Sequence, residues 1–367
     1  MKKEIERVAV VKCKSYRQEE VDKAVVKALK LLEFDTKKYR KIVIKPNVLG
    51  VYKDSEAIIT HPSIVKAIEK QFKGEIIIGE SSFMDTDKAL KSGGYSQFRN
   101  TLIFEQFKLV KIKDKEAKVL KSFLISKKLR DADLVINVPK MKTHGLTKMT
   151  GALKNLYGVI PGGMKQKFHK LAIGDHRFSN LLVDIYQNVS PKLNIMDCVV
   201  AMEGEGPSSG KAKKVGLILA SRNAVALDIA ASKIMGFNPK KILVIREAVK
   251  RKLYPNYNIE VVGDLRELPN LKFCKSSAAA KTLIRSFLGK LVKDNPITVD
   301  EAKCIKCRTC MDKCPMHAIS MKPYPFIDKK KCIRCFCCIE VCPKHALYLK
   351  ETRLRRVLKR LRGMNRK

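Results

Sequence analysis

The sequence contains no tryptophan, and it lacks the glycine-rich loops that bind common nucleotides. Neither G-x-G-x-x-G nor a Walker A sequence occurs in it, so an ordinary dinucleotide or nucleoside-triphosphate site has no support. It also lacks an uninterrupted apolar run of about 18 residues, the length that a membrane-spanning helix requires. The longest apolar stretch, VGLILASRNAVALDIAASKIMGF, is interrupted by Arg222, Asp228 and Lys233. We therefore expect no transmembrane helix.

The amino terminus does not have the pattern of an export signal. Lys2 and Lys3 are followed by Glu4, Glu6 and Arg7 in MKKEIERVAVVKC, which reads as a strand and not as a signal peptide. Twelve cysteines could form disulfides in a secreted protein, but eight of them lie in two runs of metal-binding type. Because such thiols persist in a reducing compartment, we predict a cytoplasmic location.

Acidic residues are scarce relative to basic ones. The chain has 76 Lys and Arg against 36 Asp and Glu, a formal net charge of +40. Polyanions, anionic membrane surfaces and acidic proteins are therefore candidate partners, although a solvated lysine-rich surface explains the charge equally well. We do not expect nucleic acid to be a partner, since no RRM, zinc-finger or helix-turn-helix pattern accompanies the charge.

Two cysteine runs near the carboxyl terminus carry the strongest signal in the sequence. CIKCRTCMDKCP (304–315) and CIRCFCCIEVCP (332–343) share the spacing C-x2-C-x2-C-x3-C-P and lie 28 positions apart. The repeat extends beyond the cysteines, because DEAKCIKC matches DKKKCIRC and CPMHAI matches CPKHAL. This internal repeat predicts two halves related by a pseudo-twofold axis.

The spacing of these cysteines is typical of [4Fe–4S] binding. Soft, anionic thiolates suit iron–sulfur clusters, and in modules with this spacing the fourth cysteine of each run binds the other cluster. Zinc is the alternative, but zinc sites usually group cysteines in pairs with a longer gap between them. Residues 296–350 resemble the bacterial-type two-cluster ferredoxins. The predicted ligands are Cys304, Cys307, Cys310 and Cys342 for the first cluster, and Cys332, Cys335, Cys338 and Cys314 for the second.

Four further cysteines lie outside the ligand sets. Cys337 aligns with Thr309 of the first half, and we interpret it as a plain thiol near the second cluster. A role in ligand exchange or redox chemistry is the alternative. The isolated Cys13, Cys198 and Cys274 are predicted to be core residues.

Upstream of residue 276, short apolar runs alternate with helical patterns. This alternation predicts an α/β fold with a mainly parallel or mixed sheet covered by helices, followed by a small α+β ferredoxin-like domain. We expect an α/β domain at 1–275, a connecting amphipathic helix at 276–295, the ferredoxin-like domain at 296–350 and a basic tail at 351–367. The tail has apolar residues at helix spacing and could bind a membrane surface or an acidic protein, or dock on its own chain.

Polar residues follow several of the predicted strands. In open parallel sheets, ligands bind outside the carboxyl ends of the strands, so these residues are expected to converge. Lysines, hydroxyl groups and a helix amino terminus together suit a phosphate or carboxylate. The candidate substrate-binding residues are Lys45, Asn47, Glu80, Ser81, Lys140, Lys142, Thr143, Lys154 and Asn155.

Three residues are candidates for catalysis. His144 could transfer a proton, since its charge can change near neutral pH, or it could be a hydrogen-bonded structural histidine. Glu203 and Glu205 lie between glycines and could bind a divalent cation or act as a general base, although a solvated loop is the alternative. We expect His169 and His176 in a mobile segment, with no assigned role.

Six segments of the chain resemble one known family. These segments are KPN, THPSIV, GES, PKMKTHGLTKMTGALKNLYG, MEGEGPSSG and AVALDIAASKIMGF. They are similar to the family called domain of unknown function 362, across most of residues 5–265. Many members of this family carry a two-cluster ferredoxin segment at the carboxyl terminus. The resemblance implies a shared core and a shared site, but no settled reaction.

Two classes of function remain open at this point. In the first, the clusters exchange electrons with a redox partner protein and with a small anionic substrate or cofactor in the α/β domain. In the second, the protein is a ferredoxin-type electron carrier or maturation adaptor whose α/β domain docks a partner. A convergent pocket that faces a cluster favours the first class, and a flat basic face favours the second.

Overall fold

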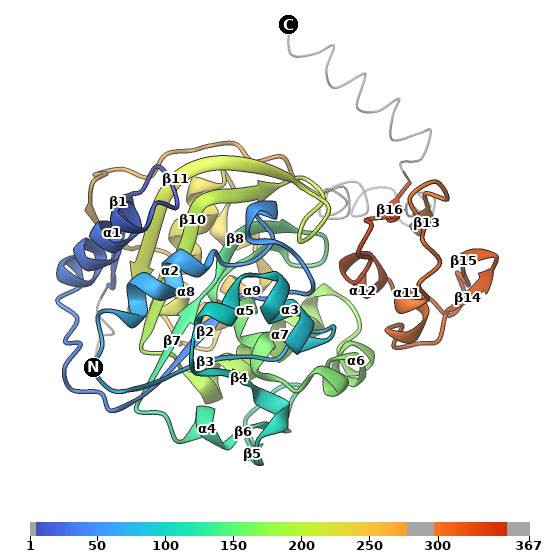
Figure 1. Cartoon of the computed structure of the whole chain (residues 1–367), viewed down its shortest axis with the longest axis horizontal. Helices are drawn as coiled ribbons and strands as arrows, with labels where there is room; N and C mark the ends of the chain where they lie inside the picture. Colours follow the sequence, from blue (N-terminus) through green and yellow to red (C-terminus); the bar gives the residue numbers. More distant parts are fainter. Residues whose placement is uncertain (1–4, 277–296, 351–367) are drawn as a thin grey trace, which may run out of the picture.

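A ten-stranded mixed sheet lies at the centre of the α/β domain (Figure 1). The computed structural model describes residues 5–276 and 297–350. The main path of the sheet runs in the order β12 (Glu260–Gly263), β1 (Arg7–Lys12), β11 (Lys211–Ser221), β10 (Leu193–Glu203), β7 (Leu134–Val138), β2 (Lys41–Pro46), β3 (Glu75–Glu80) and β4 (Thr101–Ile103). Two strands lie off this path, because β8 (Lys140–His144) pairs with β10 and with β9 (Lys148–Thr150). Strands β10, β7, β2, β3 and β4 are parallel, whereas β11 is antiparallel to both of its neighbours.

The parallel strands are apolar on both sides because each side of the sheet has its own core. In β2, Ile42 and Ile44 pack into one core, and Val43, which points the opposite way, packs into the other. All five residues of β7 are buried. A continuous apolar run of this kind is expected for a strand with helices on both faces. The predicted α/β class with a mixed sheet is therefore confirmed.

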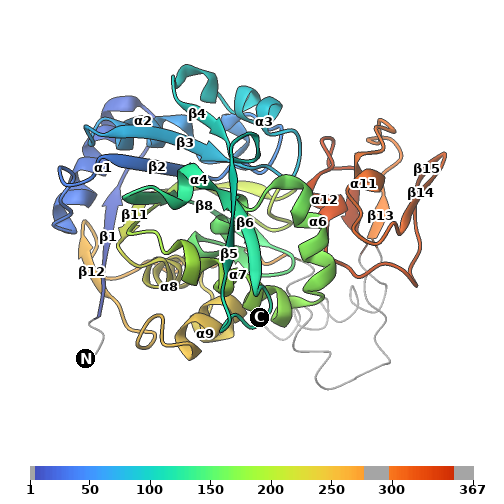
Figure 2. The same ribbon diagram turned by 90° about the horizontal axis from the view of Figure 1, so that it is seen from below.

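Helices cover both faces of the sheet (Figure 2). One core contains side chains from α1 (Gln18–Leu31), α2 (Pro62–Glu69) and α3 (Thr86–Ser92). The other contains side chains from α5 (Ala152–Asn155), α6 (Gly162–Leu171), α7 (Asp175–Val189), α8 (Ala224–Ile234) and α9 (Leu243–Lys250). Pro62 opens α2, because its fixed φ suits the first turn of a helix, and Gly236 follows the end of α8 with a φ of +76°, a conformation that glycine adopts readily.

The remaining elements of the α/β domain are short. An antiparallel pair of strands, β5 (Leu109–Lys113) and β6 (Ser122–Ser126), precedes α4 (Lys127–Arg130). Single turns of 3₁₀-helix occupy Asp54–Glu56, Tyr95–Gln97, Phe104–Gln106, Leu156–Val159 and Pro239–Lys241. In the described part of the chain, no helix is long and apolar enough to cross a membrane.

The ferredoxin-like segment reproduces its sequence repeat in its backbone. Strand β13 (Ile297–Val299) pairs with β16 (Leu347–Leu349), and β14 (Ile319–Lys322) pairs with β15 (Tyr324–Ile327). Helix α11 (Thr309–Asp312) lies 28 positions before α12 (Cys337–Glu340). Left-handed backbone recurs at the same offset, in Lys306, Arg308 and His317 of the first half and in Arg334, Phe336 and His345 of the second. The two halves therefore have the same local fold, as the repeat predicts.

The two halves of this segment face different surroundings. Both views place α12 toward the α/β domain and the β14–β15 hairpin on the far side (Figures 1 and 2). The Tyr52 hydroxyl donates to the Glu340 carbonyl oxygen at 2.9 Å, and Gln166 Nε2 donates to the Asp312 carbonyl oxygen at 2.8 Å. The Ser209 hydroxyl contacts His345 Nδ1 at 3.2 Å. The predicted connecting helix after Ser276 and the predicted basic tail lie outside the described residues.

Candidate active site between the two domains

The structure brings the predicted first ligand set together around one space. Cys304, Cys307, Cys310 and Cys342 all line an empty volume of about 350 Å³. Cys342 reaches this space from the second cysteine run, as the exchange of the fourth ligand between halves requires. The Cys310 thiol lies within electrostatic range of the other three. The first set thus forms without any rearrangement of the chain.

The thiols of the second predicted set also lie near one another. The Cys338 thiol is within electrostatic range of Cys335, Cys332 and Cys314, and also of Cys310 from the first set. A backbone N–H donates to the sulfur of each exchanged cysteine, from Ala318 to Cys314 at 3.3 Å and from Ala346 to Cys342 at 3.2 Å. N–H groups that point at the sulfurs are among the features that tune iron–sulfur potentials.

The donor chemistry fits a multi-iron cluster better than a single ion. Within residues 5–276 and 297–350, no three His, Cys, Asp or Glu side chains converge closely enough to hold one metal ion. A zinc site would need sulfurs about 2.3 Å from a common centre. The thiols instead surround a wider space, and soft thiolates are the ligands that iron–sulfur clusters take.

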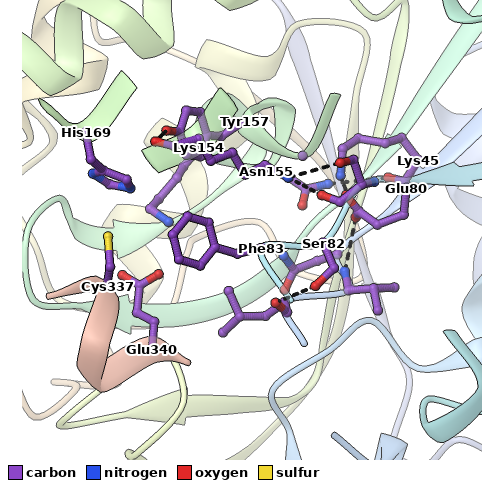
Figure 3. A pocket seen from close by; sticks show the side chains of 16 residues that line it. Lys45, Glu80, Ser82, Phe83, Lys154, Asn155, Tyr157, His169, Cys337 and Glu340 are labelled. Atoms are coloured by element: carbon purple, nitrogen blue, oxygen red, sulfur yellow. Dashed lines mark hydrogen bonds and ion pairs between the residues drawn. The ribbon is translucent and has the colours of Figure 1, made fainter. Parts of the chain in front are cut away.

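A second space, here called the interdomain pocket, lies between the α/β domain and α12. Its empty volume is about 520 Å³. The side chains converge on it from the ends of β2 and β3, from α5 and α6, and from α12 (Figure 3). Its lining residues are Lys45, Asn47, Val48, Leu49, Glu80, Ser81, Ser82, Phe83, Lys154, Asn155, Tyr157, Gly158, Lys165, His169, Cys337 and Glu340.

A buried ion pair forms the floor of the interdomain pocket. Lys45 Nζ lies 2.7 Å from Glu80 Oε2, and both side chains are almost fully buried. Glu80 also accepts hydrogen bonds from the N–H groups of Val48, at 3.2 Å, and Ser81, at 2.9 Å. A Cβ on Gly158 would lie 2.2 Å from Glu80 Oε1 and 2.4 Å from Lys45 Nζ. Only glycine therefore lets the chain after α5 approach this pair.

Replacing Glu80 by glutamine is expected to lower the free energy of unfolding by about 3–5 kcal/mol, because Lys45 would remain buried without its counter-charge. Denaturant unfolding of the anaerobic protein would measure the change. The matched control is Glu116→Gln at an exposed site, which should shift the free energy by less than about 0.5 kcal/mol. Equal stability of the two variants would show that the Lys45–Glu80 pair is not structurally important.

Glu340 brings a carboxylate from the ferredoxin-like segment into the interdomain pocket. Its Oε1 lies 3.0 Å from His144 Nε2. Burial alone would raise the pKa of Glu340, but the Lys154 ammonium and His144 outweigh it and lower this pKa to about 2. Glu340 is therefore ionised at neutral pH and places a fixed negative charge at this end of the pocket.

His144 is held neutral at neutral pH, which corrects the expectation that its charge changes there. Burial, followed by the field of Lys154, lowers the pKa of His144 to about 4. Its Nδ1 accepts the N–H groups of Leu146, at 3.0 Å, and Thr147, at 3.3 Å. The proton of the neutral ring is therefore on Nε2, which faces Glu340.

The ammonium of Lys154 has no hydrogen-bond or salt-bridge partner among the described residues. Glu340 acts on it electrostatically at longer range. Burial lowers the pKa of Lys154, and Glu340 opposes this effect. Figure 3 shows its side chain directed toward the space between Phe83, Cys337 and Glu340. A negatively charged group in this space would satisfy it.

One buried polar atom beside Lys154 in the sequence also lacks a protein partner in the described residues. Asn155 Oδ1 makes no hydrogen bond, although the amide nitrogen of the same side chain donates to Asn137 Oδ1 at 2.8 Å. Buried polar groups are nearly always hydrogen-bonded, and an unpaired one is costly. A polar ligand that reached both Asn155 Oδ1 and Lys154 would satisfy these two groups.

Lys165 is a further pocket lysine, and its pKa lies far below the ordinary lysine value. Its ammonium donates to the Ser81 carbonyl oxygen, and its side chain is buried. Burial lowers the pKa of Lys165 to about 7, with Glu80 opposing the shift. A group of this kind can both give and take a proton at neutral pH.

Cys337 lies at the boundary between the second ligand set and the interdomain pocket. It is buried and packs against Phe83 and Val341. It lines the pocket together with Glu340, whereas its neighbour Cys338 belongs to the group of thiols around the second set. Cys13 and Cys198 are buried as predicted, but Cys274 is exposed, so its assignment to the core is wrong.

Six of the predicted substrate-binding residues line the interdomain pocket, and three do not. Lys140 contacts the Tyr16 hydroxyl at 2.6 Å and Asp197 Oδ2 at 2.8 Å. The six residues that line the pocket are Lys45, Asn47, Glu80, Ser81, Lys154 and Asn155.

The side chains of Lys142 and Thr143 also donate hydrogen bonds to other groups of the protein. Lys142 donates to Asn47 Oδ1 at 2.9 Å and to the Ile58 carbonyl oxygen at 2.5 Å, and Thr143 donates to the Gly204 carbonyl oxygen at 3.0 Å. Two lysines two residues apart on one strand would repel each other, but Asp197 pairs with Lys140 and oxygens of Asn47 and Ile58 accept from Lys142, so the protein itself relieves this repulsion without an anion.

Glu203 and Glu205 lie outside the interdomain pocket. Glu203 binds Lys213 Nζ at 2.8 Å and the Cys274 N–H at 3.0 Å. Glu205 accepts from the Ser276 hydroxyl at 3.1 Å. Neither belongs to a group of three potential metal ligands within the described ranges, and a divalent cation beside them stays an untested prediction.

The histidines expected in a mobile segment are in regular helices instead. His169 is buried in α6 and stacks on Phe178 with ring centroids 4.7 Å apart. His176 lies exposed in the first turn of α7. The segment expected to be mobile forms α6, whose buried residues are Lys165, Phe168 and His169.

Comparison with known proteins agrees with this architecture. The model of the family described as domain of unknown function (DUF362) matches residues 42–233, and that of the 4Fe-4S dicluster domain matches residues 303–353. The chain is 32% identical over 211 residues to the thylakoid-associated protein sll1697 of Synechocystis sp.. This match covers 55% of the chain and 65% of the relative, so the chain spans just under two thirds of its length.

A solved structure is also similar. It is the lactate racemase apoprotein from Thermoanaerobacterium thermosaccharolyticum, with a TM-score of 0.44 and 14% sequence identity. The match covers 62% of this chain and 57% of that one.

Proposed function

We propose that this chain, which belongs to the DUF362 family and carries a 4Fe–4S ferredoxin domain, transfers electrons between its clusters and a small anion in the interdomain pocket. One observation carries the proposal. The short helix α12 supplies Cys338 to the second ligand set and supplies Cys337 and Glu340 to the wall of the pocket. A ligand beside Lys154 would therefore lie next to a cluster.

The proposal includes two [4Fe–4S] clusters. It is supported by the 28-residue repeat of cysteines and by the way each half contributes its fourth cysteine to the other set. A bound cluster supplies one-electron chemistry at a potential that its surroundings set. The protein supplies the ligands, the N–H groups on sulfur and the path from one ligand set to the pocket.

The charge of the pocket supports an anionic substrate. Its wall contains the lysines Lys45, Lys154 and Lys165 and the glutamates Glu80 and Glu340, which leaves one net positive charge when all are ionised. Lys45 and Glu80 neutralise each other at 2.7 Å. A carboxylate or a phosphate ester that accepts from Lys154 would balance the remaining charge.

Each residue near this anion has a role that its geometry supports. Lys154 binds the negative group, and Asn155 Oδ1 accepts a hydrogen bond from a substrate hydroxyl or amine. His144 holds Glu340 in place through Nε2. Lys165, whose pKa is lowered to about 7, is the group that exchanges a proton with the substrate when electrons arrive. It takes the role that the sequence suggested for His144.

Anaerobic purification followed by mass spectrometry of bound small molecules tests the proposal. We expect a carboxylate or phosphate compound to co-purify and, when added back, to reoxidise the reduced clusters. If no small anion is found and the reduced protein instead transfers its electrons only to a bound protein, the chain is an electron carrier or maturation adaptor. A cytoplasmic location remains a prediction, and fractionation of the native host would test it.

A further inference from the structure

The two cysteine runs differ sharply in their exposure although their backbones match. In the first run, Ile305, Lys306, Cys307 and Arg308 are all exposed, with Ile305 57% accessible. The equivalent positions of the second run, 333–336, are partly covered. The first ligand set therefore reaches the surface of the protein, whereas the second is turned toward the interdomain pocket.

The surface beside the first ligand set is basic with an apolar centre. Ile305, Lys306, Cys307, Arg308 and Lys344 line the same space as the other first-set thiols, and we call these five residues the entry face. All five are exposed. Three are cations, and no hydrogen bond or salt bridge of the described residues neutralises them. An apolar centre within a charged rim is typical of protein-binding surfaces.

The excess of positive charge extends over the whole segment. Residues 297–350 contain 11 Lys and Arg against five Asp and Glu. One of the five, Glu340, points into the interdomain pocket, and another, Asp300, is paired with Lys303 at 3.0 Å. A positive surface steers negatively charged partners toward it and raises the rate of encounter.

We propose that the entry face docks an acidic one-electron carrier protein. The geometry favours a protein over a lipid surface, because the exposed ligand Cys307 lies among the cations and a docked carrier would place its own redox centre against it. Small contact areas with charged rims are characteristic of weak electron-transfer encounters. The inference rests on the proposed function, because that function gives the direction in which electrons flow between the carrier and the pocket. Binding of the carrier can be measured independently.

The electron path then runs through the segment from outside to inside. One electron would leave the reduced carrier, which becomes oxidised, for the cluster that the first ligand set would hold. The second ligand set, which includes Cys338, would hold the cluster nearest the pocket, and this cluster would pass the electron to the substrate next to Lys154. A two-electron reduction requires two docking events, and Lys165 supplies a proton. The same path run backward oxidises the substrate and reduces the carrier.

Reversal of two charges on the entry face tests this docking. The variant Lys306→Glu with Lys344→Glu is compared with Lys23→Glu with Lys37→Glu, which has the same net charge but changes exposed residues beside α1, at the opposite end of the molecule (Figure 1). The probe is an acidic single-cluster ferredoxin, which carries one electron, and calorimetry under anaerobic conditions measures its dissociation constant. The visible spectrum and iron content confirm that each variant keeps its clusters.

We expect the entry-face variant to bind the ferredoxin at least about tenfold more weakly at low salt, and the control variant to change less than about twofold. Binding of the parent should also weaken as salt rises. Equal weakening in both variants, or none in the entry-face variant, would overturn the proposal. So would loss of binding to vesicles of anionic phospholipid with ferredoxin binding unchanged, which would make the entry face a membrane contact. If the ferredoxin binds as expected but no pocket ligand exists, only the proposed substrate chemistry fails.

Discussion

Replacing Lys154 by methionine is expected to abolish the binding of small carboxylates and phosphate esters while leaving the clusters intact. Lys154 is the pocket lysine that makes no hydrogen bond or salt bridge within the described residues, so its charge is available to a ligand. Losing one partner of a buried charge pair costs about 3 kcal/mol, or roughly a hundredfold in affinity. Anaerobic calorimetry measures the affinity, and iron analysis with the visible spectrum measures cluster content.

The matched control for this prediction is Lys167→Met. Lys167 lies on the exposed side of α6, close to the pocket in the fold but not part of its lining. The substitution Lys167→Met removes the same charge as Lys154→Met. It should leave the affinity for small anions within about twofold of the parent, since exposed charges are largely screened. If Lys154→Met binds anions as the parent does, the ligand site lies elsewhere and the α/β domain is better interpreted as a docking surface.

Replacing Cys338 by alanine should remove about half of the iron, whereas Cys337→Ala should remove none. The parent is expected to contain about eight iron and eight acid-labile sulfide per chain, from two ligand sets. The Cys338 thiol lies near those of Cys335, Cys332 and Cys314 at the position that the repeat gives to a ligand. Cys337 contacts Cys335 but packs against Phe83 beside the pocket, and its equivalent in the first half is Thr309. Iron and sulfide analysis of anaerobic preparations measures the difference, and the two variants serve as controls for each other.

Three results would contradict this assignment. Equal iron loss in both variants would mean that the ligand in the CFCC sequence has been chosen wrongly. Iron near four per chain in the parent would leave only one cluster, and stoichiometric zinc would replace the iron–sulfur assignment altogether. A Cys337→Ala variant with full iron but altered anion affinity would place this side chain in contact with the pocket ligand.

The sequence predicts best those elements whose local residue pattern matches the way that they pack in the fold. The apolar run KIVIKP forms β2 because both of its faces meet a core, and Pro62 opens α2 because its fixed φ suits a first helical turn. Lys45 and Glu80 meet because parallel strands end at the same edge of the sheet. These relations follow from spacing and chain direction alone.

The residues that sequence reasoning misplaced depend on partners far away in the chain. Lys140 has the pattern of a free strand-end lysine, but Asp197, which lies 57 positions later, neutralises it. The role of Glu340 is hidden for another reason. Its equivalent in the first half of the repeat is Asp312, which is also acidic, and nothing in the repeat indicates which half packs on the α/β domain. Only the packed structure distinguishes them.

If the interdomain pocket binds an anion as proposed, the position of Glu340 makes the ferredoxin-like segment a determinant of ligand selectivity. When all its lysines and glutamates are ionised the pocket carries one net positive charge with Glu340 in place, and without Glu340 the same lysines would favour a doubly charged anion. Exchange of this segment for that of another ferredoxin would therefore change which compound binds, even if every residue of the α/β domain were kept. A substitution in α12 would therefore alter the anion preference of a pocket built mostly from the α/β domain.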